Sequence, residues 1–193
     1  DKMRRASGDS ILIFGALKID STNYLNNSLI IENKNQEPVF YDKAKLVPFG
    51  EYLPMGDLSG YLFNLFQLDR PNIVKGDNNS FISGDGLRIG SSICYEIAYQ
   101  DDVAFQAKNS DVIFSASNDN WFGTTIGPHQ HLQIARYRAA ENQKPLLRST
   151  STGISAAINF RGEVIEQIPD EEVISTYSHG SFEDLCAGKG PQL

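Results

Sequence analysis

The chain has 193 residues, which is enough for one globular domain with a buried core. Apolar residues make up 40% of the chain and charged residues 21%, which excludes the disordered and collagen-like classes. Its 17 basic and 24 acidic side chains give a formal net charge of -7, which argues against nucleic acid as a partner. No apolar run approaches the roughly 20 residues of a membrane-spanning helix, and the basic start lacks the apolar region of a secretory signal.

Short apolar runs and turn-forming residues divide the chain into predicted strands and helices. Apolar runs at 10–17 and 28–32 predict a hairpin, and the first of these runs is of the kind that is buried on both faces. A third strand is predicted at 39–41 and an amphipathic helix at 58–66. The remaining predicted elements are strands 80–82 and 87–94, helix 98–107, strand 112–115, helix 132–142, and strands 146–149, 154–158 and 163–166. This alternation, without repeats or linkers, predicts an α/β layered sandwich.

The two cysteines, Cys94 and Cys186, are too few for a disulfide scaffold and lack the paired spacing of a zinc site. Cys94 ends an apolar strand, and the chain then turns through Tyr95 and Glu96 into a predicted helix. Such a turn can lift a nucleophile out of a sheet into a cleft. The alternative for Cys94 is a small core residue, since free cysteine is among the most buried residue types. Cys186 lies in a polar, glycine-rich tail.

Lys43 and Glu51 form a second candidate group, in the stretch 41–54. Apolar residues and two prolines surround these charges, and charges held in a stiff loop often serve a function. A thiol reacts as its thiolate, which a nearby cation or general base favours. The alternative is a lysine that extends its charge into solvent beside a surface glutamate.

The stretch 117–131 combines polar turn formers with Trp121, the only tryptophan. It predicts a loop that displays an aromatic side chain and can form the wall of a pocket. His129 and His131 have no third ligand at a suitable spacing, so surface or helix-cap positions are favoured over a metal site. The run 136–142 is expected to be an ion-paired helix face.

Three stretches, in this order, carry a resemblance to a known family. They are Tyr-Asp-Lys-Ala-Lys-Leu-Val-Pro-Phe-Gly-Glu-Tyr-Leu-Pro (41–54), Ser-Ile-Cys-Tyr-Glu (92–96), and the run from Asn-Asp-Asn-Trp-Phe-Gly (118–123) through Arg-Ala-Ala-Glu-Asn (138–142) to Arg-Ser-Thr-Ser-Thr-Gly (148–153). Together they resemble the carbon-nitrogen hydrolase (nitrilase) superfamily and, within it, the bacterial apolipoprotein N-acyltransferases. The resemblance covers residues 10–168 and implies a nitrilase-like α-β-β-α sandwich.

The family works through a Glu-Lys-Cys triad, and the resemblance assigns two of its members here. Cys94 matches the nucleophile. Lys43 matches the lysine that stabilises the tetrahedral oxyanion, because Lys43 and not Lys45 has the motif's spacing to Glu51. Glu51 matches a second glutamate that supports the lysine and the reacting groups.

Three further residues have matches in the family. Glu96 matches an acidic residue beside the nucleophile, and Tyr95 and Trp121 match aromatic positions near the acyl-binding pocket. The resemblance implies a ping-pong reaction without metal or organic cofactor. The thiolate takes an acyl chain from a phospholipid as a thioester, and the N-terminal diacylglyceryl-cysteine amine of an apolipoprotein then accepts it.

The family's general-base glutamate has no match, since no glutamate precedes Glu32. Its membrane helices would also lie upstream of this chain. We therefore expect residues 1–177 to be part of a catalytic domain, incomplete at both ends, that faces the periplasm from the bacterial inner membrane. Because the general base is missing, we expect this part alone to be inactive in sustained acyl transfer. The tail 178–193 does not resemble the family's continuation. Two alternatives stay open: a soluble amidase or nitrilase with water as acceptor, and a catalytically dead binding domain.

Overall fold

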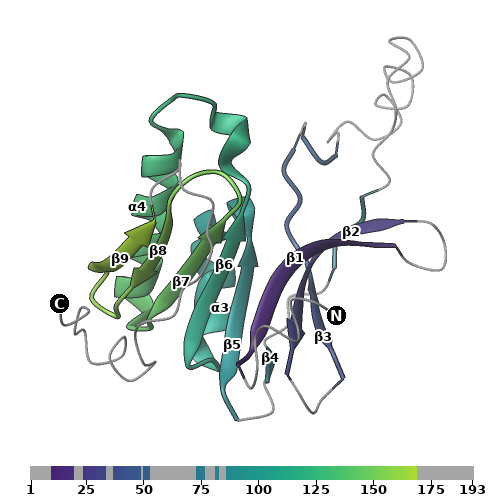
Figure 1. Cartoon of the computed structure of the whole chain (residues 1–193), viewed down its shortest axis with the longest axis horizontal. Coiled ribbons are helices and arrows are strands. Elements are labelled where there is room, and N and C mark those ends of the chain that lie inside the picture. The colour runs from purple at the N-terminus through teal and green to yellow at the C-terminus, as the bar shows by residue number, and fades with distance from the viewer. Residues whose placement is uncertain are drawn as a thin grey trace.

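The computed structural model describes residues 10–19, 24–33, 37–48, 50–52, 73–76, 81–82 and 86–168. Two β-sheets and two α-helices form this part of the chain (Figure 1). The predicted helix at 58–66, Cys186 and the tail 178–193 lie outside the described residues.

The first sheet consists of three antiparallel strands. They are β1 (Leu12–Ile19), β2 (Leu25–Glu32) and β3 (Val39–Asp42), in that order. The predicted hairpin is thereby confirmed. The expectation that its first strand is buried on both faces is wrong, because Leu17 and Ile19 are 62% and 66% exposed. Successive side chains of a strand point to opposite faces, and from Gly15 onward alternate residues of β1 are exposed.

The second sheet has six strands. They are β4 (Phe81–Ile82), β5 (Arg88–Ile93), β6 (Val112–Ser117), β7 (Leu146–Thr150), β8 (Ser155–Ile158) and β9 (Val164–Ile168), in that order. β5, β6 and β7 run parallel, whereas β4, β8 and β9 pair antiparallel. The parallel strands end at the same edge of the sheet, which is where ligands bind in many α/β proteins.

The described elements form three layers, so the predicted α/β sandwich is confirmed. Helices α3 (Gln100–Lys108) and α4 (Gly127–Asn142) pack on one face of the second sheet, around a core that includes Val103, Ile113 and Leu132. The first sheet packs on the other face, where Leu29 and Tyr41 belong to the same core as Phe114. Figure 1 shows β1 to β3 beside the second sheet, opposite the helices.

Helix α4 begins five residues before its predicted start. Pro128 lies in its first turn, where a helix does not use the missing N–H group. The predicted ion-paired face is confirmed by the contact between Arg138 Nε and Glu141 Oε1, at 3.0 Å. Pro128 therefore indicates where the helix begins, which the spacing of the apolar residues does not.

Candidate active site

A cavity of about 740 Å³ lies where the first sheet meets the carboxyl ends of the parallel strands. Four of the predicted site residues line it: Lys43, Glu51, Cys94 and Trp121. Lys43 and Glu51 come from one stretch of the chain and Cys94 and Trp121 from two others, and the fold brings all four to one place. Much of the remaining wall consists of apolar and small side chains from β1, β2 and the ends of β5, β6 and β7.

The amine of Lys43 is held at the cavity by Glu51. Lys43 follows β3 and is only 1% exposed, so the alternative of a solvent-exposed lysine is wrong. Its Nζ donates to both carboxylate oxygens of Glu51, at 2.8 and 2.7 Å. Glu51 also accepts hydrogen bonds from the side chain of Asn27 and the main-chain N–H of Val47, both at 2.8 Å. Each oxygen of Glu51 therefore has two donors, which fixes the carboxylate beside the amine.

Lys45 occupies a different environment. Its Nζ lies 3.4 Å from Asp102 Oδ2, and its side chain is 47% exposed. It also lies over the ring of Tyr99 and does not line the cavity. Of the two neighbouring lysines, the geometry brings Lys43 to the cavity that contains Cys94.

Cys94 lies at a sharp turn directly after β5. It is the first residue of the short helix η1 (Cys94–Ala98), and its φ of 55° is in the left-handed region. For a residue with a Cβ atom this conformation costs on the order of 1 kcal/mol or more, and such strain concentrates at functional sites. The thiol is free and half-buried, and it lines the cavity.

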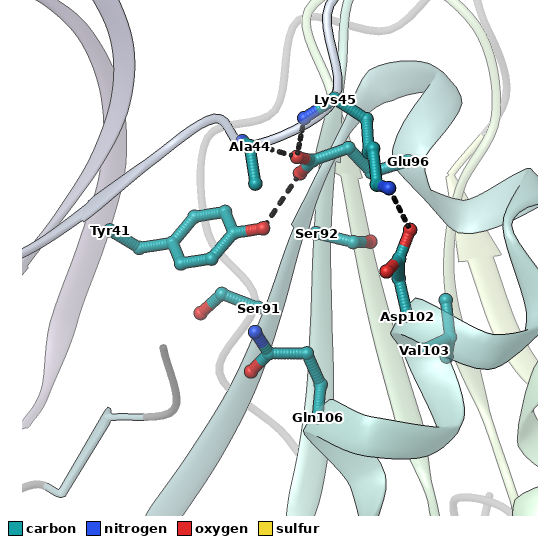
Figure 2. A pocket seen from close by; sticks show the side chains of 9 residues that line it. All are labelled: Tyr41, Ala44, Lys45, Ser91, Ser92, Glu96, Asp102, Val103 and Gln106. Carbon is teal, nitrogen blue, oxygen red and sulfur yellow. Dashed lines mark hydrogen bonds and ion pairs between the residues drawn. The ribbon is translucent and has the colours of Figure 1, made fainter. Parts of the chain in front are cut away.

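Glu96 joins the Cys94 turn to the segment that follows β3. It accepts four hydrogen bonds of 2.7 to 2.9 Å, from the main-chain N–H groups of Ile93, Ala44 and Lys45 and the hydroxyl of Tyr41. Figure 2 shows three of these donors converging on the carboxylate between the two sheets. Burial raises the pKa of Glu96, although its hydrogen bonds oppose that shift. Burial and this carboxylate also raise the pKa of Tyr41. Glu96 does not line the 740 Å³ cavity. Its neighbours Ile93 and Cys94 do.

The two aromatic candidates differ in position. Trp121 lies in the short helix η2 (Asp119–Phe122), is 80% exposed, and lines the cavity. Tyr95 is 45% exposed, packs edge-on against Tyr99 at 5.7 Å between ring centroids, and is not part of the cavity wall. Only Trp121 is therefore placed to touch a molecule in the cavity.

The expectation of a surface or helix-cap position is wrong for His131. His129 is exposed, but His131 is 3% exposed and its Nδ1 lies 2.9 Å from Asp119 Oδ1. Asp119 in turn is paired with Arg148, at 2.7 Å. This cluster is not predicted from the sequence. One signal was present, since His131, Ala135 and Ala139 recur every four residues and all lie on the buried face of α4. Across the described ranges, no group of three or more His, Cys, Asp or Glu side chains is arranged to hold a metal ion.

These features define a class of protein. The chain belongs to the carbon-nitrogen hydrolase family, whose model matches residues 6–178. Its fold is similar to that of a carbon-nitrogen hydrolase from Helicobacter pylori, with a TM-score of 0.66 at 16% identity, over 86% of this chain and 60% of the other. It is also similar to a branch 10 member of the nitrilase superfamily from Saccharomyces cerevisiae, with a TM-score of 0.64 at 19% identity, over 86% and 58% of the two chains.

Similar sequences come from one group within this class. The chain is 39% identical over 175 residues to the apolipoprotein N-acyltransferase of Photobacterium profundum, which covers 86% of the chain and 34% of that protein. It is 37% identical over 200 residues to the apolipoprotein N-acyltransferase of Haemophilus ducreyi, over 94% and 39%. The chain thus spans between a third and two fifths of the length of these relatives. No helix in its described part has the length and apolar character that a membrane crossing requires.

Proposed function

We propose that the chain carries the nucleophile and acyl-binding part of an apolipoprotein N-acyltransferase. This enzyme moves an acyl chain from a phospholipid to the N-terminal diacylglyceryl-cysteine amine of an apolipoprotein. The observation that carries the proposal is the shared cavity, in which a free thiol and a buried lysine–glutamate pair meet an apolar wall. The relatives support the choice of reaction, since they bear this name and match the chain at 37–39% identity.

In the first half-reaction, the Cys94 sulfur attacks the ester carbonyl carbon of the phospholipid. A C–S bond forms, the carbonyl oxygen becomes an oxyanion, and the ammonium of Lys43 stabilises that charge. The ester C–O bond then breaks, and the lysophospholipid leaves after its oxygen receives the proton that the thiol gave up. In the second half-reaction, the neutral amine nitrogen attacks the thioester carbonyl carbon. A C–N bond forms, the C–S bond breaks, and the proton that the nitrogen loses restores the Cys94 thiol.

Glu51 supports this chemistry by holding the lysine and does not act as the base. Of the described residues that line the cavity, it is the only carboxylate. Its two oxygens already accept four hydrogen bonds, two of them from Lys43. A base must have a free lone pair directed at the proton it takes. We infer that the proton acceptor is a group outside the described residues.

The cavity wall suits an acyl chain, and its rim suits a lipid surface. Its volume lies within the range of pockets that bind small molecules, and Ile13, Leu29 and Ala116 contribute apolar surface. Trp121 is exposed at this cavity, and tryptophan side chains are enriched at membrane–water interfaces. We infer that the whole enzyme works at the bacterial inner membrane, with this domain on the periplasmic side.

The proposal is tested by acylating the chain with a p-nitrophenyl ester of a fatty acid at mildly alkaline pH, where an ordinary thiol is partly ionised. Mass spectrometry of the peptides should find a hydroxylamine-sensitive acyl group on Cys94. Cys94→Ala should abolish this adduct, and Cys186→Ala should leave it intact. An adduct on Cys186 but not on Cys94 would contradict the proposal.

A further inference from the structure

Three ionisable side chains lie buried behind Cys94, and the proposed reaction does not use them. Asp119, His131 and Arg148 are 2%, 3% and 3% exposed, and none of them lines the cavity. They come from three elements, namely η2, α4 and β7. Since burying charge is costly unless it is well paired, their contacts with one another and with Cys94 need an explanation.

Asp119 is the centre of this cluster. Its Oδ2 accepts a hydrogen bond from Arg148 Nη2 at 2.7 Å, and its Oδ1 accepts one from the hydroxyl of Ser117 at 2.6 Å. His131 Nδ1 lies 2.9 Å from the same Oδ1. Burial alone would raise the pKa of Asp119, but the hydrogen bond to His131 and the charge of Arg148 outweigh it and lower this pKa. Asp119 is therefore a buried carboxylate.

The other ring nitrogen of His131 faces the main chain of the nucleophile. Nε2 lies 3.3 Å from the carbonyl oxygen of Cys94. A carbonyl oxygen only accepts, so the assignment that satisfies this contact places a proton on Nε2. Nδ1 lies between an acceptor, Asp119 Oδ1, and a donor, Arg148 Nη2, which is 3.1 Å away. The nitrogen Nδ1 thus has a partner in either protonation state, and Nε2 can donate to Cys94 in both.

The hydrogen bond from His131 acts at the strained turn. Cys94 has a φ of 55°, and its carbonyl oxygen belongs to the peptide plane that leads into η1. A donor fixed on this oxygen restrains that plane and therefore the conformation from which the thiol projects. Burial lowers the pKa of Arg148, and the charges of Asp119 and Cys94 act in the opposite direction.

The main chain closes around Asp119 on its other side. The Asp119 N–H donates to the carbonyl of Thr152 at 3.1 Å. Gly153 has a φ of 105°, and a Cβ atom there would lie 2.6 Å from Asp119 Oδ2. This segment can approach the carboxylate so closely only because residue 153 is glycine. The loop that ends β7, the Trp121-bearing helix η2 and the Cys94 turn are thus tied to one cluster.

We propose that His131, held by Asp119 and Arg148, is a positioning residue that fixes the Cys94 turn for acyl transfer. The inference rests on the proposed function, because it takes Cys94 to be the nucleophile. His131 does not touch the substrate. It acts through the carbonyl of Cys94, and Asp119 and Arg148 act by orienting its ring.

Two substitutions test separately the contacts that Nδ1 and Nε2 of His131 make. The side-chain amide of His131→Gln can reach the position of Nε2 and keep a donor on the Cys94 carbonyl. The amide of His131→Asn reaches only the position of Nδ1, so it keeps a contact with Asp119 and loses the one with Cys94. A purely structural role for the ring would make both variants similarly defective.

The test compares two reactions of Cys94 in the unsubstituted chain and both variants. Acylation by p-nitrophenyl butyrate needs an aligned thiol, whereas alkylation by iodoacetamide needs only an accessible one. Peptide mass spectrometry measures the extent of both reactions at Cys94, with Cys186 as an internal reference. We expect His131→Asn to lower the ratio of acylation to alkylation about tenfold, and His131→Gln to stay within about threefold. Equal ratios in the two variants would overturn the proposal.

A spectroscopic measurement keeps this inference separate from the proposed function. In a chain labelled with [1-13C]cysteine, the carbonyl signal of Cys94 reports its hydrogen bond directly. It should move in His131→Asn and stay near its original position in His131→Gln. A signal that stays in place in His131→Asn would overturn the inference. An unsubstituted chain that is acylated no faster at Cys94 than at Cys186 would contradict the proposed function instead, and the carbonyl signal would still decide the role of His131.

Discussion

Two buried ion pairs lie near Cys94, one in the segment after β3 and one between η2 and β7, and they differ in what surrounds the cation. Lys43 pairs with Glu51 at 2.7 Å, and their side chains are 1% and 16% exposed. Both residues line the cavity, so the ammonium borders the space that a substrate would occupy. Arg148 pairs with Asp119 at the same distance, but both side chains are 0% exposed and neither lines the cavity.

This difference separates direct from indirect contributions to a reaction. The charge of Lys43 can meet charge that develops on a substrate, because only the cavity lies between them. The charge of Arg148 can reach the substrate only through Asp119, His131 and the main chain of Cys94. Removing the first pair should therefore affect chemistry more than stability, and removing the second should affect stability most.

The largest effect on stability is expected from Asp119→Asn. The substitution leaves the guanidinium of Arg148 buried without a counter-charge, which should lower the free energy of unfolding by about 3 kcal/mol or more. The matched control is Asp111→Asn, because Asp111 pairs with Arg88 at 2.8 Å where both side chains are one third to one half exposed. That pair should contribute far less, because solvent screens its charges. If urea denaturation showed that both substitutions lower the free energy of unfolding equally, the distinction between buried and exposed ion pairs would be wrong.

The largest effect on chemistry is expected from Lys43→Met. Loss of the cation that faces the oxyanion should slow acylation of Cys94 by p-nitrophenyl esters about 100-fold. Stability should change less than in Asp119→Asn, since Glu51 keeps its hydrogen bonds from Asn27 and Val47. The matched control, Lys45→Met, should acylate at the rate of the unsubstituted chain. A slower Lys45→Met would show that the wrong lysine has been assigned.

The pH dependence of the free energy of unfolding gives a further test of the ion pair between Asp119 and Arg148. The pKa of Asp119 is lowered in the folded chain, so the unfolded state binds more protons as the pH falls. The stability that this carboxylate contributes is complete above its unfolded pKa of about 3.9 and is lost as the pH falls through its folded pKa. The stability difference between the unsubstituted chain and Asp119→Asn should therefore shrink below about pH 4. A constant difference in acid denaturation curves would show that the charge of Asp119 is not what stabilises the fold.

The smallest effect is expected where a buried polar group has no partner. Among the described residues, the hydroxyl of Ser91 makes no hydrogen bond although the side chain is 1% exposed. Ser91→Ala should not lower the free energy of unfolding, because it breaks no hydrogen bond and removes a buried hydroxyl that has no partner. Ser110→Ala should cost about 1 kcal/mol, because the Ser110 hydroxyl donates to the carbonyl of Gln106 at 2.9 Å. Calorimetry that ranks the two serines in the opposite order would contradict this expectation.

Local sequence patterns predicted most of the strands and helices, but not which faces of these elements would be buried. The strands near residues 112–115 and 146–149 were predicted from apolar runs, because parallel strands covered on both faces carry such runs. The same rule failed for β1, whose residues Leu17 and Ile19 are exposed. An apolar run alone does not tell which layers will cover a strand.

The candidate site was predicted where its residues belong to short motifs. Lys43 and Glu51 are eight residues apart, so their pairing depends mainly on local structure. The partners in the cluster behind Cys94 are farther apart in sequence, since Asp119 and Arg148 are 29 positions apart. Glu96 likewise meets Ala44 across 52 residues. Only the packing of the two sheets and α4 brings these groups together, and no local pattern contains that information.

The central claim is that Cys94 passes its acyl group to an amine, and the fate of the thioester tests it most directly. The acylated chain is freed of reagent and given a diacylglyceryl-cysteine peptide in detergent micelles. Mass spectrometry then compares the amide product with free fatty acid. We predict that the N-acyl peptide forms faster than the free acid, because an amine attacks a thioester readily. Release of the fatty acid alone, at a rate that the peptide does not change, would contradict the account and indicate an amidase that uses water.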